Sequence, residues 1–156
     1  MKTIAVVSDT HSNRAAIEKL YGIFGEADMI IHLGDTSSDG ALIRARFHDK
    51  TRLINGNCDF RQFGVDESVI EVEGVKIFAC HGHKYSVKST HARLLDRAKE
   101  LGCTLALYGH THCAREEVLD GVTLFNPGTL SAYSGKSYGY IVISGGKAVT
   151  KIVNID

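Results

Sequence analysis

The chain has 156 residues, of which 44% are hydrophobic and 23% are charged, and this length and composition predict one globular domain over residues 1–156. Lysine plus arginine equals aspartate plus glutamate, at 18 each, so the net charge offers no general attraction to nucleic acid or membranes. The apolar run near the amino terminus is too short for a signal peptide or a membrane span, which predicts a cytoplasmic protein with no membrane partner.

The first half of the chain contains three strand-like segments, at residues 3–8, 28–33 and 51–55. Each is a short run of mainly aliphatic residues, which is the pattern of a buried strand. Helix-like segments separate them. The β-α-β-α-β order therefore predicts parallel strands joined by right-handed crossovers.

Two helices are predicted between these strands. Ile17, Leu20 and Phe24 recur at positions i, i+3 and i+7 and predict a helix over residues 13–24. After the second strand, Asp39 is expected to cap a shorter helix.

The second half is richer in strands. Residues 68–73 and 75–80 meet at Gly74 as a predicted hairpin, and a helix over residues 89–101 precedes a strand at residues 105–108. Two further hairpin turns are predicted, at Asp120-Gly121 and Gly145-Gly146. Two strand-rich regions flanked by helices predict two packed sheets with helices outside.

Aspartate, histidine or asparagine follows five of the predicted strands. These residues are Asp9 and His11, then Asp35, Asn57, His81, and finally His110 and His112. Because the carboxyl ends of parallel strands converge on one edge of a sheet, we expect these side chains to lie close together. Carboxylate and imidazole ligands without thiolate suit divalent manganese, zinc, iron or cobalt. The set is too large for one tetrahedral ion and fits two ions that share a bridging carboxylate.

Each motif alone has a simpler explanation. Gly-Asp and Gly-Asn are common turn sequences, and the polar residues from Asp9 onward suit a helix-entry loop. His-Gly-His by itself fits an ordinary loop. Because such explanations must account for five strand ends independently, the metal site is the better hypothesis.

The order of these motifs, D-x-H, G-D, G-N, H-G-H and G-H-T-H, resembles that of the calcineurin-like metallophosphoesterases from Asp9 to Leu130. With the short length, Gly56-Asn57-Cys58-Asp59 and Asn126-Pro127-Gly128-Thr129 look most like the small YfcE-type phosphodiesterases. The resemblance implies an α/β fold, the four-layer α/β/β/α sandwich of two packed mixed sheets. It also implies hydrolysis of a small phosphodiester, and small relatives often form homodimers or homotetramers.

The resemblance implies roles for individual residues. The first metal would take Asp9, His11 and His112, the second would take Asn57, His81 and His110, and Asp35 would bridge them. Two divalent ions per chain are implied, with manganese favoured over zinc, iron, nickel or cobalt. A hydroxide that bridges the two ions would attack phosphorus in line.

One position departs from the wider superfamily. Many relatives have histidine after Gly-Asn, where it protonates the leaving group, whereas this chain has Cys58. A cysteine of ordinary pKa does not replace imidazole as a general acid at neutral pH. His83 is the leading candidate for that role, and a loop histidine without a catalytic part is its alternative.

Other residues near these motifs are assigned by their position. Asp59 is expected to orient a ligand or a water molecule, or else to cap a turn. Asn57 and Arg61 are candidates for contacts with a substrate phosphate, although a solvated arginine is the simpler reading of Arg61. His32 is expected to pack behind the site, and His91 to lie at the surface.

A function of another class fits the same fold. The retromer subunit Vps29 resembles it and acts mainly through protein contacts, with a degraded metal site. Because this chain keeps all seven ligand positions, catalysis is the better hypothesis and a scaffold is the alternative. We find no basic or aromatic-interleaved tract that would indicate a nucleic-acid partner.

Overall fold

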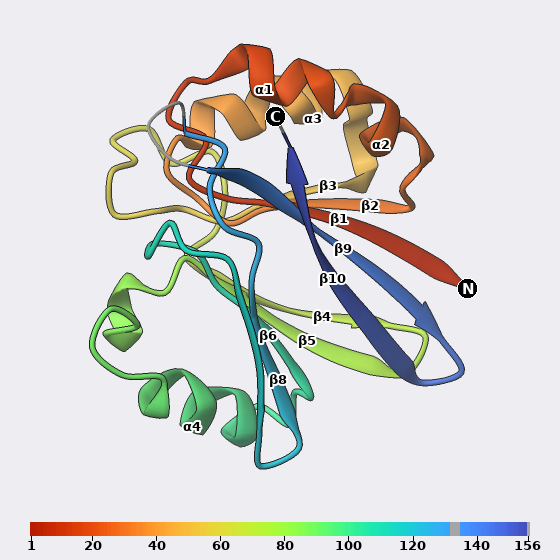
Figure 1. Ribbon diagram of the computed structural model, residues 1–156, viewed down its shortest axis with the longest axis vertical. Coiled ribbons are helices and arrows are strands. Elements are labelled where there is room, and N and C mark those ends of the chain that lie inside the picture. The colour runs from red at the N-terminus through yellow and green to blue at the C-terminus, as the bar shows by residue number, and fades with distance from the viewer. Residues whose placement is uncertain (132–134, 156) are drawn as a thin grey trace.

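The computed structural model describes residues 1–131 and 135–155, and its centre is a pair of five-stranded mixed sheets packed face to face (Figure 1). The first sheet has the order β10-β9-β1-β2-β3 and contains β1 (Lys2–Val7), β2 (Met29–His32), β3 (Thr51–Leu53), β9 (Lys136–Ser144) and β10 (Lys147–Ile155). The second has the order β4-β5-β6-β8-β7 and contains β4 (Glu67–Val72), β5 (Val75–Cys80), β6 (Leu105–Leu107), β7 (Arg115–Leu119) and β8 (Val122–Asn126). Neighbours among β1, β2 and β3 pair in parallel, as do those among β5, β6 and β8.

Helices cover the two outer faces, which confirms the predicted four-layer α/β/β/α sandwich (Figure 1). The first sheet carries α1 (Arg14–Lys19), α2 (Tyr21–Glu26) and α3 (Ser37–Phe47), and the second carries α4 (Ala92–Glu100). Two short 3-10 helices, η1 (His48–Lys50) and η2 (His83–Tyr85), lie in the connections. Within the part of the chain that the structure describes, every helix is too short or too polar to cross a membrane.

Alternate residues of a strand face opposite sides of its sheet, and this alternation fills three separate cores. In β1, Ile4 and Val6 pack between the two sheets. Ala5 and Val7 of the same strand face the other way and pack with residues of α1, α2 and α3. The third core lies between the second sheet and α4. β1 is therefore buried on both faces, as its continuous apolar sequence predicts.

The predicted helix over residues 13–24 is two helices in the structure. Leu20 separates α1 from α2 because its φ of −94° and ψ of 0° depart from helical values. The apolar face was predicted correctly, since Ile17, Leu20 and Phe24 are all buried against the first sheet.

The prediction that Asp39 caps a helix is wrong. α3 begins at Ser37, so Asp39 lies inside its first turn, and it is buried. Its carboxylate instead accepts hydrogen bonds from the hydroxyl of Thr10 (2.6 Å) and the backbone N–H of Ser12 (2.9 Å). Asp39 thus holds the loop that follows β1.

The second half follows the predictions closely. The turns at residues 73–74, 120–121 and 145–146 connect antiparallel strands, as expected. α4 begins at Ala92, later than predicted, because residues 86–90 form turns instead of the first helical turn. At its other end Gly102 takes a φ of 72°, and the N–H of Cys103 donates to the carbonyl of Ala98 (2.8 Å).

Candidate metal centre

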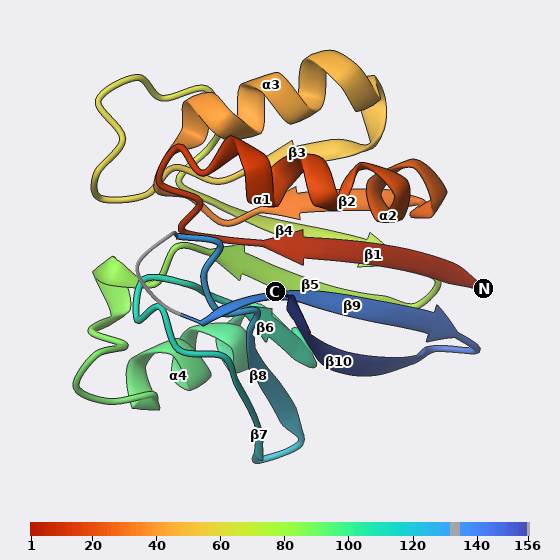
Figure 2. The same ribbon diagram turned by 45° about the horizontal axis from the view of Figure 1, so that its top comes forward.

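The loops after β1, β2, β5 and β6 meet at one end of the sandwich, toward which the arrowheads of β1 and β5 point (Figure 2). In the first sheet the N–H of Asp9 donates to the carbonyl of Gly34 (2.9 Å). In the second sheet the N–H of Gly109 donates to the carbonyl of His81 (2.9 Å). Backbone hydrogen bonds therefore fix neighbouring loops side by side.

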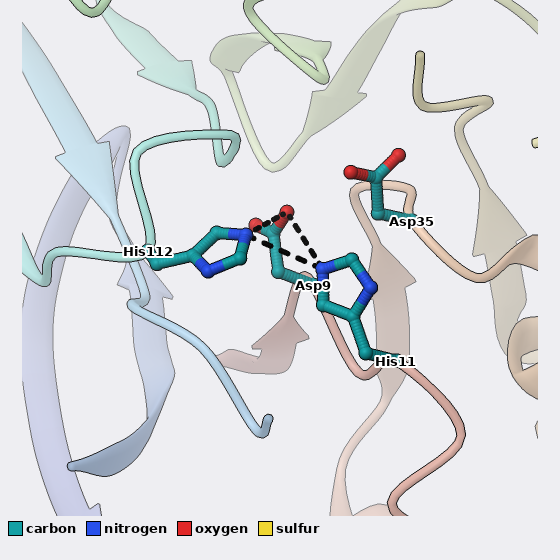
Figure 3. A group of neighbouring side chains, drawn as sticks. All are labelled: Asp9, His11, Asp35 and His112. Atoms are coloured by element: carbon teal, nitrogen blue, oxygen red, sulfur yellow. Dashed lines mark hydrogen bonds and ion pairs between the residues drawn. The ribbon is translucent and has the colours of Figure 1, made fainter. Parts of the chain in front are cut away.

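Six of the seven predicted ligands form two groups that share one residue. The first group is Asp9, His11, Asp35 and His112, and the second is Asp35, His81 and His110. Within each group the potential ligand atoms lie within 4.8 Å of one another. Figure 3 shows the carboxylate of Asp9 between the rings of His11 and His112, with Asp35 beside them. Asp35 is the member that both groups have in common.

The two oxygens of the buried Asp9 carboxylate have different surroundings. Oδ2 accepts a hydrogen bond from the hydroxyl of Ser8 (2.6 Å) and another from the backbone N–H of His110 (3.0 Å). Oδ1 has no hydrogen bond from any residue that the structure describes, although Nε2 of His112 lies 3.2 Å away and Nε2 of His11 lies 3.9 Å away. One oxygen thus fixes the carboxylate, and the other faces the histidines.

Asp35 is held by the loop after β3. Its Oδ1 accepts from the backbone N–H of Cys58 (2.9 Å), and the N–H groups of Asp35 and Gly56 both donate to Oδ2 of Asp59 (3.0 and 2.7 Å). Burial alone would raise the pKa of Asp35, but His81 and the N–H of Cys58 hold it well below its usual value. Asp35 therefore stays ionised, and Asp59 positions the two loops that surround it.

The tautomer of His81 follows from its hydrogen bond. Nδ1 lies 2.8 Å from the carbonyl oxygen of Leu33, which can only accept, so Nδ1 carries a proton. In the neutral ring, Nε2 then presents a lone pair. Nε2 is buried and has no hydrogen bond within the described part of the chain, and it lies 3.4 Å from Oδ2 of Asp35 and 3.9 Å from Oδ1 of Asp9.

These contacts fit bound cations. A neutral His81 would point its lone pair at two carboxylate oxygens, and such an arrangement is repulsive unless a positive charge lies between them. Nε2 of His11 and Nε2 of His112 also lie only 3.3 Å apart beside the unpaired oxygen of Asp9. Carboxylate and imidazole donors suit divalent transition metals, and backbone carbonyls commonly fix the other ring nitrogen of such histidines.

Metal binding is expected to release protons near neutral pH. Burial would lower the pKa of His81, but Asp35, Asp9 and the carbonyl of Leu33 raise it above its usual value. The metal-free protein therefore holds a proton on His81 at pH 6.5, and a metal ion must displace it. Apparent metal affinity should rise with pH through this raised pKa.

The measurement is isothermal titration of the metal-free protein with Zn²⁺ at pH 6.5, in two buffers that differ in ionisation enthalpy. We expect His81 to release a proton from more than half of the molecules, because its pKa lies above the pH of the titration. Burial and the charge of His81 lower the pKa of His110, so His110 contributes a smaller share of the released protons. His48→Gln is the control, since His48 is exposed. Identical heats in both buffers would contradict the proton on His81.

The backbone at the predicted ligands is strained. Asp9, His11, Asp35, His110 and His112 all have positive φ, between 43° and 72°. Residues with a Cβ adopt this region at a cost, and such positions concentrate at functional sites. Hydrogen bonds of the surrounding loops hold these conformations in place.

Two glycines allow the backbone to pass close to the carboxylates. A Cβ added to Gly56 would lie 2.1 Å from Oδ1 of Asp35, and one added to Gly109 would lie 2.0 Å from the hydroxyl oxygen of Ser8 and 2.8 Å from Oδ2 of Asp9. Neither space admits a methyl group. The glycines beside the predicted ligands are thus required by close approach.

The loop after β3 carries the remaining predicted residues. Asn57 is exposed, and its amide nitrogen lies 3.6 Å from the sulfur of Cys58. Arg61 is exposed and lines a small pocket with Cys58 and Asp59. The roles of Asn57 as a ligand and of Arg61 as a phosphate contact stay predictions.

His83 lies beside the second ligand group. Its ring centroid is 5.5 Å from that of His81 and 6.1 Å from that of His110. Nδ1 is buried without a hydrogen bond among the described residues. Burial and the charge of His81 lower the pKa of His83, so the ring is largely neutral at pH 7 in the metal-free protein.

Sequence reasoning missed a polar network behind the site. The N–H of Gly34 donates to Nδ1 of His32 (3.1 Å), so Nε2 carries the proton and donates to the hydroxyl oxygen of Thr10 (3.0 Å). Thr10 in turn donates to Asp39. The expectation that His32 packs behind the site is confirmed, because it is fully buried there. The partners lie on three elements, which no local motif reveals.

Two residues of the Asn126-Pro127-Gly128-Thr129 segment support the ligand loops. Asn126 donates to the carbonyl of Gly109 (3.2 Å) and to the hydroxyl of Thr111 (3.0 Å). Thr129 donates to the carbonyl of Asp9 (2.7 Å). The segment thus supports the loops that carry Asp9 and His110 from behind.

The sequence and the fold both match known proteins. A family model described as the calcineurin-like phosphoesterase superfamily domain matches residues 1–146. A Bacillus subtilis protein named probable metallophosphoesterase YsnB is 31% identical over 128 residues, which cover 81% of this chain and 74% of YsnB. Phosphodiesterase YfcE of Escherichia coli strain K12 is 26% identical, and the match covers 90% of this chain and 88% of YfcE. A crystal structure of a Vps29 single mutant from Entamoeba histolytica has a TM-score of 0.78 at 18% identity and covers 99% of both chains.

These likenesses differ in what they establish. The Vps29 structure supports the fold alone, because its sequence identity is low. The family model spans nearly the whole chain, and the match to YfcE confirms the resemblance that the motif order indicated. The protein belongs to the calcineurin-like phosphoesterase superfamily.

Proposed function

We propose that the protein is a metal-dependent phosphodiesterase that hydrolyses a small phosphodiester at the two joined ligand groups. The observation that carries the proposal is the position of Asp35, which belongs to both groups where the two sheets meet. Two divalent ions, with manganese proposed ahead of zinc, iron, nickel or cobalt, would supply a nucleophile from water and offset the charge of the reacting phosphate in an in-line displacement.

The chain positions its ligands before any substrate arrives. Ser8 and the N–H of His110 fix Asp9, and the carbonyl of Leu33 fixes the ring of His81. Asp59 holds the backbone N–H of Asp35. Such preorganisation favours catalysis because the site does not have to rearrange as charge develops on the phosphate.

We assign protonation of the leaving group to His83. The pKa of Cys58 is raised by burial and by the charge of Asp35, so its thiol holds its proton more tightly than an ordinary cysteine. His83 lies next to His81 and His110, and its Nδ1 has no hydrogen-bond partner among the residues that the structure describes. An anionic phosphate beside His83 would favour its protonated form and prepare it to donate.

The test is an assay of the metal-stripped protein with Mn²⁺, Ni²⁺, Zn²⁺ or Mg²⁺ restored. Hydrolysis of bis-p-nitrophenyl phosphate, a diester, is compared with that of p-nitrophenyl phosphate, a monoester. We expect metal-restored cleavage of the diester and little cleavage of the monoester. Absence of turnover with every metal, in protein shown to bind two ions per chain, would contradict the proposal.

The same experiment addresses a second candidate function, a non-catalytic scaffold. This candidate rests only on the fold that the chain shares with Vps29 over 99% of both chains. The six grouped ligands oppose it, because protein contacts do not require a shared carboxylate between two sets of histidines. Metal binding without turnover would favour the scaffold, and would make Cys58 the first residue to replace with histidine.

A further inference from the structure

A pocket adjoins the candidate metal centre. It is a pocket of about 510 Å³ between the segment that precedes α4 and the segment that follows β6. Residues 87–91 form one wall, and Thr111, Cys113 and Arg115 contribute to the other. None of these residues belongs to the two ligand groups.

The pocket and the metal centre share a boundary. Thr111, which lines the pocket, lies in the sequence between the ligand-group residues His110 and His112, and its hydroxyl accepts from the side chain of Asn126 (3.0 Å). Lys88 lines the pocket from the opposite wall. A phosphate at the metal centre would place its ester groups near the pocket.

One wall of the pocket carries a positive charge, Lys88, with no ion-pair partner among residues 1–131 and 135–155. Residues 81–95 contain no aspartate or glutamate. Within this segment Lys84 pairs with Asp66 (3.0 Å), and Arg93 donates to the hydroxyl of Ser86 (3.1 Å). Lys88 is exposed and has no ion pair or hydrogen bond in the described part of the chain.

The other basic residues of the pocket lining, Arg115 and His91, are paired and held in place. Arg115 pairs with Glu117 (3.2 Å), and the same carboxylate contacts Nδ1 of His91. Nε2 of His91 lies 3.4 Å from the hydroxyl of Tyr108, whose pKa burial raises to about 12. His91 is therefore half-buried and bonded on both sides, which corrects the expectation of a surface residue. Among the described residues that line the pocket, Lys88 is therefore the one basic residue without an oppositely charged partner.

We propose that this pocket holds one ester substituent of the substrate, and that Lys88 selects substituents that carry a second anionic group, such as a carboxylate or a phosphate. The inference rests on the proposed function, because it places the reacting phosphate at the neighbouring ligand groups. The hydroxyls of Ser89 and Thr90 offer hydrogen bonds to such a group. A small apolar substituent would leave these hydroxyls and the ammonium group of Lys88 without a hydrogen-bond partner.

The experiment compares two ligands that differ at one carbon. Glycerol 3-phosphate and 3-phosphoglycerate both carry a phosphate monoester, but the second has a carboxylate in place of a hydroxymethyl group. Each is titrated into zinc-loaded, 15N-labelled protein, and dissociation constants are taken from the amide shifts of residues 87–91. We expect 3-phosphoglycerate to bind about tenfold more tightly, as a charge-assisted hydrogen bond to Lys88 would give.

Two variants separate Lys88 from general electrostatics. Lys88→Gln should reduce the preference to about twofold or less, because the charge-assisted contact is lost. Lys147→Gln removes an equal charge from the exposed start of β10 and should keep the preference. Equal affinities in the parent protein, or a preference that survives Lys88→Gln, would overturn the assignment.

Hydrolysis of bis-p-nitrophenyl phosphate by the same preparations reports the proposed function separately. A protein that cleaves the diester but shows no carboxylate preference would overturn the role of Lys88 and leave the phosphodiesterase standing. A preference lost in Lys88→Gln, without cleavage of any diester, would support the anion pocket and overturn the phosphodiesterase.

Discussion

Asp35→Asn should lower kcat/KM for a phosphodiester by about a thousandfold or more, because Asp35 is the carboxylate that both ligand groups share. Asparagine is nearly the same shape, and its amide oxygen can still accept from the N–H of Cys58. It lacks the negative charge that would hold two cations together. Metal analysis of the purified variant should therefore find fewer than two ions per chain.

The loss should not come from misfolding. In the metal-free protein the variant loses the ion pair with a protonated His81, so its urea midpoint should fall, but the new amide nitrogen can donate to Nε2 of a neutral His81 and unfolding should remain a single cooperative transition. Asp120→Asn is a matched control, since Asp120 has nearly the same φ as Asp35, 51° against 50°, and lies in an exposed hairpin turn. Activity of Asp35→Asn within tenfold of the control would contradict the shared role of Asp35.

Gly109→Ala should damage both stability and activity. The added methyl group would meet the hydroxyl of Ser8 at 2.0 Å and the carboxylate of Asp9 at 2.8 Å, and both side chains are fully buried. Overpacking of this kind costs about 1–3 kcal/mol of folding free energy. A carboxylate displaced by about 1 Å should also lower kcat/KM by about a hundredfold. Urea unfolding of the metal-free protein and the diester assay measure the two effects.

Two further variants show whether steric overlap is the cause. Gly22 lies in α2 with nothing within 4 Å of an added Cβ, so Gly22→Ala should be neutral or stabilise by up to about 1 kcal/mol. Combining Ser8→Gly with Gly109→Ala removes the closest clash and should recover part of the lost stability. Normal activity and stability of Gly109→Ala alone would show that the two loops separate easily, and would weaken the case for a rigid site.

Residue patterns predict the secondary structure well where the pattern is local. β1 is a run of aliphatic residues buried on both faces, and Gly102 ends α4 as its position indicates. The break at Leu20 has no such signal, because Ile17, Leu20 and Phe24 keep one apolar face across both helices. The capping role predicted for Asp39 is wrong because the carboxylate of Asp39 accepts a hydrogen bond from the buried Thr10 and not from the helix end.

The candidate site is predictable in its ligands and much less so in its supports. Asp9, Asp35 and His81 follow strands directly, so strand order alone brings them together. The bond from Thr129 to Asp9 instead joins residues 120 positions apart. This hydrogen bond depends on how the two sheets and their loops pack together, and a local sequence pattern does not determine that packing.

The division of ligands between the two sheets has a consequence for how the protein folds. The loops of the first sheet supply Asp9, His11 and Asp35, and those of the second supply His81, His110 and His112. Each ligand group needs members from both sheets, so neither half of the chain alone can bind an ion tightly. High-affinity metal uptake therefore requires the sheets to have docked first. Bound ions would then cross-link the two sheets only after the sheets have packed together. They would lower the unfolding rate more than they raise the folding rate.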